Sequence, residues 1–267
     1  VSKQLMPIYD KPMIYYPLST LIAAGIHEIL IISTPEDLPL FERLLGDGSQ
    51  WGCAFSYAEQ AEPKGLAEAF IIGESFIGES SAALILGDNL FHGGKFSEQL
   101  AALDKIDGGH IFAYQVKDPE RYGVVAFDTK NRIISLEEKP EQPKSSFAVP
   151  GIYFYDNTVV QKAKNLRPSK RGELEITDIN KSYLAEQMLR LTPLEVGSAW
   201  LDTGTIESLM EASQYVQALQ SRQGVLVGSP EVAAYTSKAI SLEQLLEIAK
   251  KMTYTPYGEA IKSLATR

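Results

Sequence analysis

One short run of the sequence constrains the fold more than any other feature. Residues 28–34 (EILIIST) form a continuous apolar and β-branched stretch, which is typical of a strand covered on both faces, as in a parallel sheet. The apolar residues 13–24 come directly before it and end at Gly25, a residue that suits the left-handed position after a helix. A helix followed at once by a buried strand predicts a layered α/β architecture.

The same alternation continues through the first third of the chain. Residues 40–45 predict a helix, 55–59 a strand, 66–77 a helix and 82–86 a strand. We therefore expect a Rossmann-like α/β fold, a three-layer sandwich around a twisted, mostly parallel mixed sheet. Ligands of such sheets bind beyond the carboxyl ends of the strands, and Asp88 lies just beyond the last of these strands.

Strand patterns dominate the middle of the chain, and helical patterns dominate its end. The predicted segments are a helix at 95–104, strands at 110–116, 122–128, 132–137 and 148–155, helices at 159–165 and 176–187, strands at 190–196 and 200–202, and helices at 206–221, 242–252 and 257–265. We divide the chain into one large domain, residues 1–221, and a helical C-terminal appendage, residues 222–267.

Composition and charge argue against several classes of function. The chain has 267 residues, 45% of them apolar, and a formal net charge of −9, so a nucleic-acid backbone would be repelled. Its one cysteine, Cys53, excludes an internal disulfide and fits a reducing compartment. No apolar run reaches the roughly 20 residues that span a bilayer. We expect a cytoplasmic protein that binds neither nucleic acid nor membrane.

The residue types that serve nucleophilic or zinc-dependent catalysis are poorly represented. His27, His92 and His110 are the only histidines, and none has a partner at metal-ligand spacing. The chain also has no G-x-S-x-G elbow. Phosphoryl transfer onto a phosphate monoester needs no base, because that nucleophile already carries about two negative charges. It needs a divalent metal, cations and backbone N–H groups around the reacting centre.

Two aspartates stand where a metal would need them. Asp88 follows an apolar strand and Gly87, and Asp202 follows Trp200-Leu201. Mg²⁺ commonly takes one or two carboxylates and completes its shell with water and substrate phosphates. Each aspartate taken alone is equally explained as the cap of the next turn or helix, so the pattern leaves both interpretations open.

Five motifs occur in order along the chain. They are SKQLMP with KPMI within residues 2–14, LGDN at 86–89, EEKP at 137–140, RGELEITD at 171–178 and WLDTG at 200–204. Together they resemble the motifs of the glucose-1-phosphate thymidylyltransferases, and the resemblance runs from Val1 to about Ser263. It implies a Mg²⁺-dependent transfer of dTMP from dTTP to glucose 1-phosphate in a homotetramer. The dTDP-glucose formed would feed deoxysugar synthesis, such as that of dTDP-rhamnose.

The resemblance implies which residues hold the nucleotide. Lys3 contacts the triphosphate, Gln4 lies near the nucleotide, Gln60 and Gly65 form the base pocket, and Asp88 is shared with the metal. A glutamine amide can accept from the pyrimidine N3–H and donate to a ring carbonyl, while glycine gives the base room to approach. Without the resemblance, Lys3 would be a solvated terminal lysine and Gln60 an ordinary strand-end residue.

The sugar-phosphate side is assigned in the same way. The residues implied are Tyr122, Gly123, Glu138, Lys139 and Val149. Lys139 would contact the sugar phosphate, where a compact charge with three rotatable donors can follow the moving oxygen. Arg171 lies near the phosphates, so the resemblance gives it a catalytic role beside Lys3 and Lys139. Asp88 and Asp202 correspond to the metal-binding pair.

The chain departs from the family pattern at several positions. Pro150 replaces a usual threonine and removes a hydroxyl and an N–H beside the sugar, which leaves the hexose open. Glu62-Pro63-Lys64 replaces Ser-Pro-Asp near the base. His92 stands where an aromatic residue is common, near a second nucleotide site of relatives, so feedback control is open too.

The largest departure is at the start of the chain. The family opens with a strand and a G-G-x-G-T-R-L loop whose N–H groups and arginine hold the triphosphate, and Val1 begins after it. That strand would lie inside the sheet, and sheet edges without it would stay open. We expect about twenty further residues ahead of Val1 in the natural protein. The intact mass of the purified protein tests this expectation, and a mass of 29.4 kDa would contradict it.

Other functions remain open from the sequence. UTP or another hexose 1-phosphate would serve the same chemistry, because uracil and thymine present the same edge to Gln60. A glycosyltransferase acting on a nucleotide sugar would carry a D-x-D motif, which this sequence lacks. A catalytically silent nucleotide-sugar-binding protein would bind ligand without releasing pyrophosphate, but it would have less need of Asp88, Asp202 and Lys139.

Overall fold

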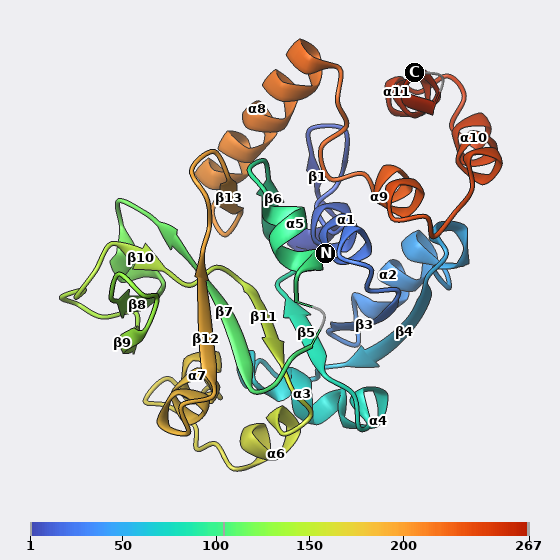
Figure 1. Ribbon diagram of the computed structural model, residues 1–267. Helices are drawn as coiled ribbons and strands as arrows, with labels where there is room; N and C mark the ends of the chain where they lie inside the picture. The colour runs from blue at the N-terminus through green and yellow to red at the C-terminus, as the bar shows by residue number, and fades with distance from the viewer. Residues whose placement is uncertain (1, 104, 266–267) are drawn as a thin grey trace.

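The chain begins as the sequence predicts, with a helix that leads into a parallel strand pair. In the computed structural model, which describes residues 2–103 and 105–265, helix α1 (Tyr15–Ala23) precedes strand β3 (Glu28–Ser33). Strand β3 pairs in parallel with β4 (Ala54–Glu59), and α2 (Leu38–Leu45) connects them. The predicted helix–strand alternation is therefore confirmed in this part of the chain (Figure 1).

The remaining elements are short, apart from the helices near the end of the described chain. They are a 3-10 turn at Lys3–Leu5, β1 (Pro7–Ile8), β2 (Lys11–Pro12), a 3-10 turn at Ser49–Trp51, α3 (Glu68–Ile72), α4 (Glu74–Ile77), β5 (Ala82–Ile85), β6 (Asn89–His92), α5 (Phe96–Ala101), β7 (Gly109–Gln115), a 3-10 turn at Pro119–Arg121, β8 (Gly123–Phe127), β9 (Ile133–Glu138), β10 (Phe147–Ala148), β11 (Ile152–Tyr155), α6 (Val159–Lys164), α7 (Ile176–Ala185), β12 (Leu189–Pro193), β13 (Ala199–Asp202), α8 (Ile206–Gln223), α9 (Pro230–Thr236), α10 (Leu242–Lys251) and α11 (Pro256–Ala265).

The large sheet is mixed. Its strands lie in the order β5-β11-β7-β10-β8-β9, with β12 beside β7, and Figure 1 shows β12, β7, β11 and β5 crossing the middle of the molecule. The expected α/β fold with a mixed sheet is confirmed. The expectation that the strands are mostly parallel is wrong for the described residues, because most of their strand pairs are antiparallel. The parallel pairs among them are β3–β4, outside the large sheet, and β7–β12 within it. Strands such as β8 and β9 return through a tight turn, which requires antiparallel pairing.

Alternate residues of the central strands pack into different cores. On β7, Ile111 and Ala113 belong to the cluster formed with α3, α6 and α7, whereas Phe112 belongs to the cluster formed with α5. On β11, Tyr155 belongs to the first of these clusters and Phe154 to the second. Successive side chains of a strand point to opposite faces, so both faces of the sheet are covered. The predicted three-layer arrangement follows from this burial pattern.

Several boundaries differ from those expected. The strand expected at 148–155 is split by Pro150 into β10 and β11, because proline cannot donate to a ladder. The helix expected at 66–77 is interrupted at Gly73, a weak helix former. Helix α5 ends at Ala101, and Asp104, where we expected its end, lies outside the described residues. Helix α9 and strand β6 were not expected at all.

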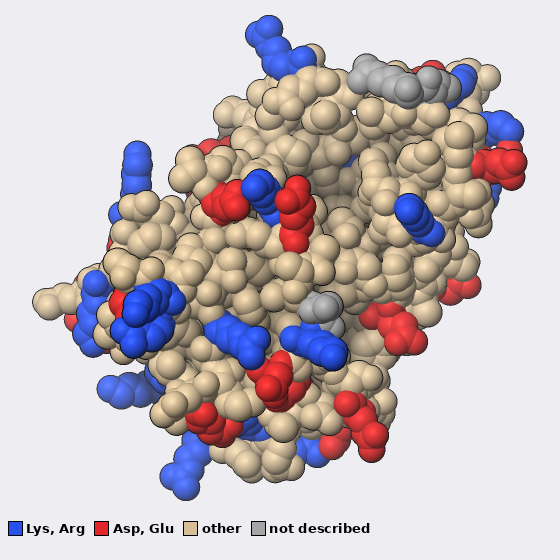
Figure 2. Space-filling model, viewed as in Figure 1, with Lys and Arg blue, Asp and Glu red and all other residues tan. Residues whose placement is uncertain are grey.

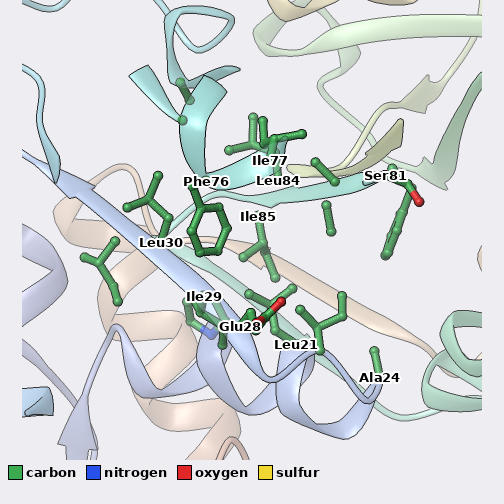
Figure 3. Close-up of a pocket in the computed structure, with 18 of the residues that line it drawn as sticks. Leu21, Ala24, Glu28, Ile29, Leu30, Phe76, Ile77, Ser81, Leu84 and Ile85 are labelled. Carbon is green, nitrogen blue, oxygen red and sulfur yellow. The ribbon is translucent and has the colours of Figure 1, made fainter. Parts of the chain in front are cut away.

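A cavity of about 610 Å³ separates β3 from β5. Its lining is mainly apolar and comes from these two strands together with α1, α3 and α4. Figure 3 labels Leu30 of β3 and Leu84 and Ile85 of β5 among the side chains around it. At one end the lining includes Gly87, the residue before Asp88. An apolar space therefore runs between two strands toward the candidate metal residues.

The strand edges that face this cavity have no partner strand in the described chain. Strand β3 pairs only with β4, and β5 pairs only with β11. The carbonyl of Ser33 accepts from Gln60 on the β4 side, so Leu30 and Ile32 direct their backbone groups away from β4. The N–H of Leu86 donates to Gly151 on the β11 side, so Ala83 and Ile85 direct theirs away from β11. Buried backbone groups of this kind normally find hydrogen-bond partners.

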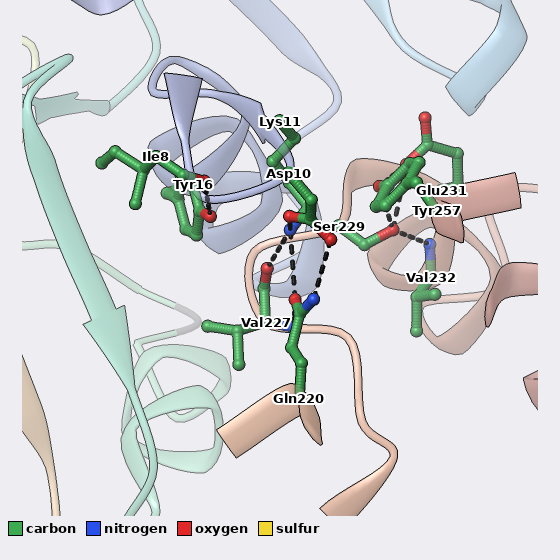
Figure 4. A network of polar contacts seen from close by, with 10 residues as sticks. All are labelled: Ile8, Asp10, Lys11, Tyr16, Gln220, Val227, Ser229, Glu231, Val232 and Tyr257. Carbon is green, nitrogen blue, oxygen red and sulfur yellow. Dashed lines mark hydrogen bonds and ion pairs between the residues drawn. The ribbon is translucent and has the colours of Figure 1, made fainter. Parts of the chain in front are cut away.

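A buried lysine joins the beginning of the chain to its C-terminal helices (Figure 4). Lys11 is 3% exposed, and its ammonium donates to Asp10, to Gln220 of α8 and to the carbonyl of Val227. It also lies 5.1 Å from the centre of the Tyr257 ring on α11. Burial lowers the pKa of Lys11, and the nearby Asp10 carboxylate opposes that shift. The C-terminal helices are thus held by polar contacts as well as by a core shared with α1.

We expect Lys11→Met to destabilise the protein by about 2–4 kcal/mol, because Asp10 and the Val227 carbonyl lose a charged donor in a buried setting. The free energy of unfolding in urea measures the effect. Lys250→Met is the matched control, since Lys250 is an exposed residue paired with Glu247 on one helix face, where such pairs contribute about 0.5 kcal/mol. Equal stability of the two variants would contradict the role of Lys11.

Candidate active site

Asp88 and Asp202 lie at adjoining ends of two paired strands. Strands β6 and β13 are antiparallel, and Asp202 is opposite Asn89, the residue after Asp88. The backbone of Thr203 completes the arrangement, since its N–H donates to the Asp88 carbonyl over 3.1 Å and its hydroxyl donates to the same oxygen over 2.8 Å. The structure thus brings together two aspartates that are 114 positions apart in the sequence.

The electrostatics of this pair suit a divalent cation. Burial raises the pKa of Asp202, and the negative charge of Asp88 raises it further, while Lys3 and Arg121 lower it. Lys3 forms an ion pair with Asp88. Two carboxylates are a donor set that Mg²⁺ accepts when phosphates and water fill its other positions. Within residues 2–103 and 105–265 there is no cluster of three or more metal-binding side chains.

Gln4 lies beside the same corner of the site. Its side chain packs over Gly87, where an added Cβ would be 3.0 Å from the Gln4 Cγ. The carbonyl of Gln4 accepts from the N–H of Ile14 over 2.9 Å, which fixes the first turn of the chain against α1. Lys3 and Gln4 are therefore neighbours of Asp88, as their assignment to the nucleotide requires.

Asn89 has a role that the sequence reasoning missed. Its side-chain oxygen accepts from the Trp200 indole over 2.6 Å and from the Gly151 N–H over 3.1 Å. Its amide nitrogen donates to the Asp88 carboxylate over 2.9 Å. Because both partners of the oxygen are N–H donors, the amide has only one acceptable orientation. At 3% exposure, Asn89 links Asp88 to both β13 and β11.

The residues expected to bind the sugar gather where β8 and β9 meet. Gly123 is opposite Glu138 in the antiparallel register, and the Lys139 N–H donates to the Tyr122 carbonyl over 3.0 Å. The Val149 N–H donates to the Gly123 carbonyl over 2.8 Å, whereas the Val149 side chain is buried in the core. The Val149 side chain is therefore not available to a ligand.

An aromatic contact connects this group to the two aspartates. The Tyr122 ring lies 5.1 Å from the ring of Trp200, two residues before Asp202. Burial raises the pKa of Tyr122, and the charge of Asp202 adds to the shift. The sugar-side residues and the carboxylate pair thus border one region of the molecule.

Lys139 holds an unusual backbone conformation. Its φ angle is +42°, in the left-handed region that non-glycine residues rarely occupy. Such conformations require support from the surrounding structure and often occur at functional sites. In this protein the support is the backbone hydrogen bond to Tyr122. The side chain of Lys139 is exposed, so it is accessible to a phosphate.

Arg171 lies in an acidic group rather than alone. Its guanidinium binds Glu175 with contacts of 2.8 and 2.9 Å and lies 3.8 Å from Glu138. The neighbouring Glu138 carboxylate accepts from the hydroxyl of Thr177. Thr177 is 4% exposed and lies in the first turn of α7, and the sequence reasoning did not single it out. The sequence signal that could have identified Thr177 is its place in the RGELEITD motif at 171–178.

The residues expected in the base pocket lie in the loop between β4 and α3. Gln60 follows β4, and Gly65 has a φ of +104°. A Cβ at Gly65 would be 2.4 Å from the Leu174 carbonyl, so only glycine fits at this position, whatever ligand binds. Leu174 also donates its N–H to the Lys64 carbonyl over 2.7 Å. This hydrogen bond attaches the loop between β4 and α3 to the segment that carries Arg171.

We expect Asn89→Leu to lower the free energy of unfolding by about 2–4 kcal/mol, because two buried N–H groups lose their acceptor. The fluorescence of Trp200 should change as its indole loses its partner. Asn157→Leu serves as the control, because Asn157 lies in an exposed turn. A stability equal to that of the control, with unchanged fluorescence, would contradict the proposed orientation of the amide.

Comparisons with known proteins agree with this geometry. A family model described as nucleotidyl transferase matches residues 1–218. The chain is 52% identical to the glucose-1-phosphate thymidylyltransferase of Mycolicibacterium smegmatis, over 100% of this chain and 93% of the relative. It is 53% identical to that of Neisseria meningitidis, over 99% and 92%.

Solved structures show the same likeness. A Bacillus anthracis protein assigned to the glucose-1-phosphate thymidylyltransferases superimposes with a TM-score of 0.73 at 38% identity, over 80% of this chain and 85% of that one. A UDP-glucose pyrophosphorylase follows with 0.68 at 25% identity, over 81% and 90%. The chain therefore belongs to the nucleotidyl transferase family, in the group of the glucose-1-phosphate thymidylyltransferases.

Proposed function

We propose that the protein transfers dTMP from dTTP to α-D-glucose 1-phosphate and releases pyrophosphate. The observation that carries the proposal is the placement of Asp88 and Asp202 at adjoining strand ends, with Lys3 paired to Asp88. The start of β8 and the end of β9, where the sugar-side residues lie, border the same region. The names of the most similar relatives support the same reaction. The dTDP-glucose formed would supply deoxysugar synthesis.

The chemistry needs no protein nucleophile or base. An oxygen of the sugar phosphate attacks the α-phosphorus of dTTP in line, the bond from that phosphorus to the bridging oxygen breaks, and pyrophosphate leaves. The attacking monoester already carries about two negative charges, so the barrier arises largely from the approach of two anions. Lys3, Lys139 and Arg171 would offset that charge. Arg171 already binds carboxylates through its guanidinium, and a phosphate would compete for the same donors.

Asp88 and Asp202 are the residues that would hold Mg²⁺. A bound Mg²⁺ would neutralise charge that develops on the phosphate oxygens. Asn89 holds the Asp88 carboxylate in a fixed orientation through its amide, and Thr203 holds the Asp88 backbone. These contacts keep the two carboxylates in place before substrate arrives, so less ordering is required when it binds.

Gln4, Gln60 and Gly65 would hold the nucleotide beside Lys3 and Asp88. The side-chain amide of Gln60 can pair with the imide edge of thymine, but uracil presents the same edge. Any preference for dTTP over UTP would then come from contacts with the thymine methyl group or with the 2′ position of the sugar, where UTP carries a hydroxyl. UTP as the substrate is thus the nearest alternative, and its chemistry would be the same.

The sugar would lie against Tyr122, Gly123, Glu138 and the backbone at Val149. An added Cβ at Gly123 would be 3.4 Å from the Glu138 carboxylate and 3.2 Å from the Thr177 hydroxyl, so any larger residue would narrow this space. The carboxylate of Glu138 can accept from sugar hydroxyls. Pro150 offers no N–H at the neighbouring position, and another hexose 1-phosphate is the alternative that this change raises.

We further propose that an additional apolar strand fills the cavity between β3 and β5. The open edges of both strands and the apolar lining support it. This position suits the strand with which the family that the chain resembles opens. Since the cavity reaches Gly87, the residues that continue from such a strand would lie near Lys3 and Asp88, where a triphosphate needs backbone N–H groups.

The wider properties of the chain fit small-molecule substrates. Acidic and basic side chains are interspersed over the face shown in Figure 2, with no continuous basic patch. Together with the net charge of −9, this argues against a nucleic-acid partner. No helix among the described residues could cross a membrane. A cytoplasmic location, a homotetramer and the division of the chain at residue 221 complete the proposal.

Pyrophosphate release with a panel of triphosphates and hexose 1-phosphates tests the proposed function. We expect dTTP with glucose 1-phosphate to give the highest kcat/KM. Asp88→Asn should reduce kcat/KM by about 10³-fold, since it removes half of the carboxylate pair. Asp128→Asn is the control, because Asp128 lies beside the turn between β8 and β9, where its carboxylate pairs with Arg132 rather than with a residue of the candidate site. Faster turnover of UTP, or binding of dTTP without any pyrophosphate release, would overturn the proposal.

Amide hydrogen exchange of the full-length protein tests the proposed strand. The N–H groups of Leu30, Ile32, Ala83 and Ile85 face the cavity, and a paired strand would protect them. We expect them to exchange as slowly as the N–H of Ile31, which faces β4. Fast exchange confined to the four cavity-facing amides would show that no strand occupies the space.

A further inference from the structure

A carboxylate on α3 fixes the amide of Gln60. The Gln60 side-chain nitrogen donates to the Glu68 carboxylate over 2.7 Å. It also approaches the Gly65 carbonyl at 3.4 Å, which is longer than a good hydrogen bond. The contact between the two side chains is partly buried, so solvent reaches it only in part.

The chemistry of the two groups allows only one orientation of the amide. A carboxylate accepts hydrogen bonds and donates none, whereas the two ends of an amide have opposite polarity. Turning the Gln60 amide over would place its oxygen against the oxygens of Glu68 and would lose the hydrogen bond. The Gln60 oxygen must therefore point away from Glu68, together with the one N–H that lies on the same edge of the amide.

We propose that Glu68 is a positioning residue that sets the base preference of the site through Gln60. The edge that Gln60 presents accepts from a ring N–H and donates to an adjacent carbonyl. Thymine and uracil carry that pattern, whereas cytosine has a ring acceptor beside an amino group and needs the reverse. The inference rests on the proposed function only in taking Gln60 as the residue that contacts the base.

A simpler role for Glu68 must be separated from this one. Glu68 lies in the first turn of α3, where a negative charge is favourable in any protein. The charge of Lys64 also interacts with it, although Lys64 makes its ion pair of 3.0 Å with Glu62. A purely structural role would change the affinity for every nucleotide equally, while the positioning role changes the ratio between bases.

Glu68→Gln removes the constraint while keeping the shape of the side chain. A glutamine at this position can accept or donate, so the Gln60 amide becomes free to take either orientation. We expect the preference for dTTP over dCTP, measured as the ratio of dissociation constants in the full-length protein, to fall by about tenfold or more. Glu68→Ala should lower the same ratio, and this second variant covers the case in which Glu68→Gln folds poorly.

Glu62→Gln is the matched control, because it removes the same charge from the loop just ahead of α3 and its own ion pair is with Lys64. We expect the preference of this variant for dTTP over dCTP to equal that of the unaltered protein. The inference would be overturned if the ratio of dissociation constants for dTTP and dCTP in both Glu68 variants stayed within about twofold of the ratio in the unaltered protein. Equal affinity of the unaltered protein for the two nucleotides would overturn it as well.

Turnover separates the two proposals. If the unaltered protein prefers dTTP and the Glu68 variants lose that preference, the inference stands even where no pyrophosphate is released, and only the proposed function fails. If pyrophosphate is released and the ratio does not change, the inference alone fails.

Discussion

The candidate site depends on holding two carboxylates beside each other against their repulsion. Burial raises the pKa of Asp202, and the charge of Asp88 raises it further, so an unsupported pair would tend to separate or to bind a proton. The pairing of β6 with β13 prevents the separation, and Asn89 and Thr203 each hold Asp88 by hydrogen bonds. The arrangement stores an unfavourable interaction that a cation can relieve, which is what a binding site for a divalent metal requires.

The strand pair that carries these carboxylates is itself fixed from both sides. On β6, Phe91 packs with Trp200 in the cluster beneath α5, whereas Leu90 packs with Met13 and with Val216 of α8 in another. A shift of β6 by one residue would exchange the two clusters and turn Asp88 to the opposite face. The register of two hydrophobic side chains on β6 therefore determines the geometry of the polar site.

The sequence predicts most of the fold because each element carries a local pattern. The β-branched run at 28–34 and the order of short strands follow from periodicity alone. The direction of strand pairing does not, because it depends on how the turns close, and the same residues suit either direction. Asn89 and Thr177 escaped notice because their partners Trp200 and Glu138 are distant in the chain. Aspartates at strand ends could be predicted, but not what holds them.

Asn89 and Gln60 illustrate why such contacts cannot be read from residue types. Each side chain ends in an amide that could face either way, and water would satisfy both orientations because it donates and accepts equally well. In this protein the amide oxygen of Asn89 meets two N–H donors, and the amide nitrogen of Gln60 meets the Glu68 carboxylate. Partners of a single polarity remove the ambiguity. Two flexible groups thereby acquire a direction, one toward Asp88 and the other away from Glu68.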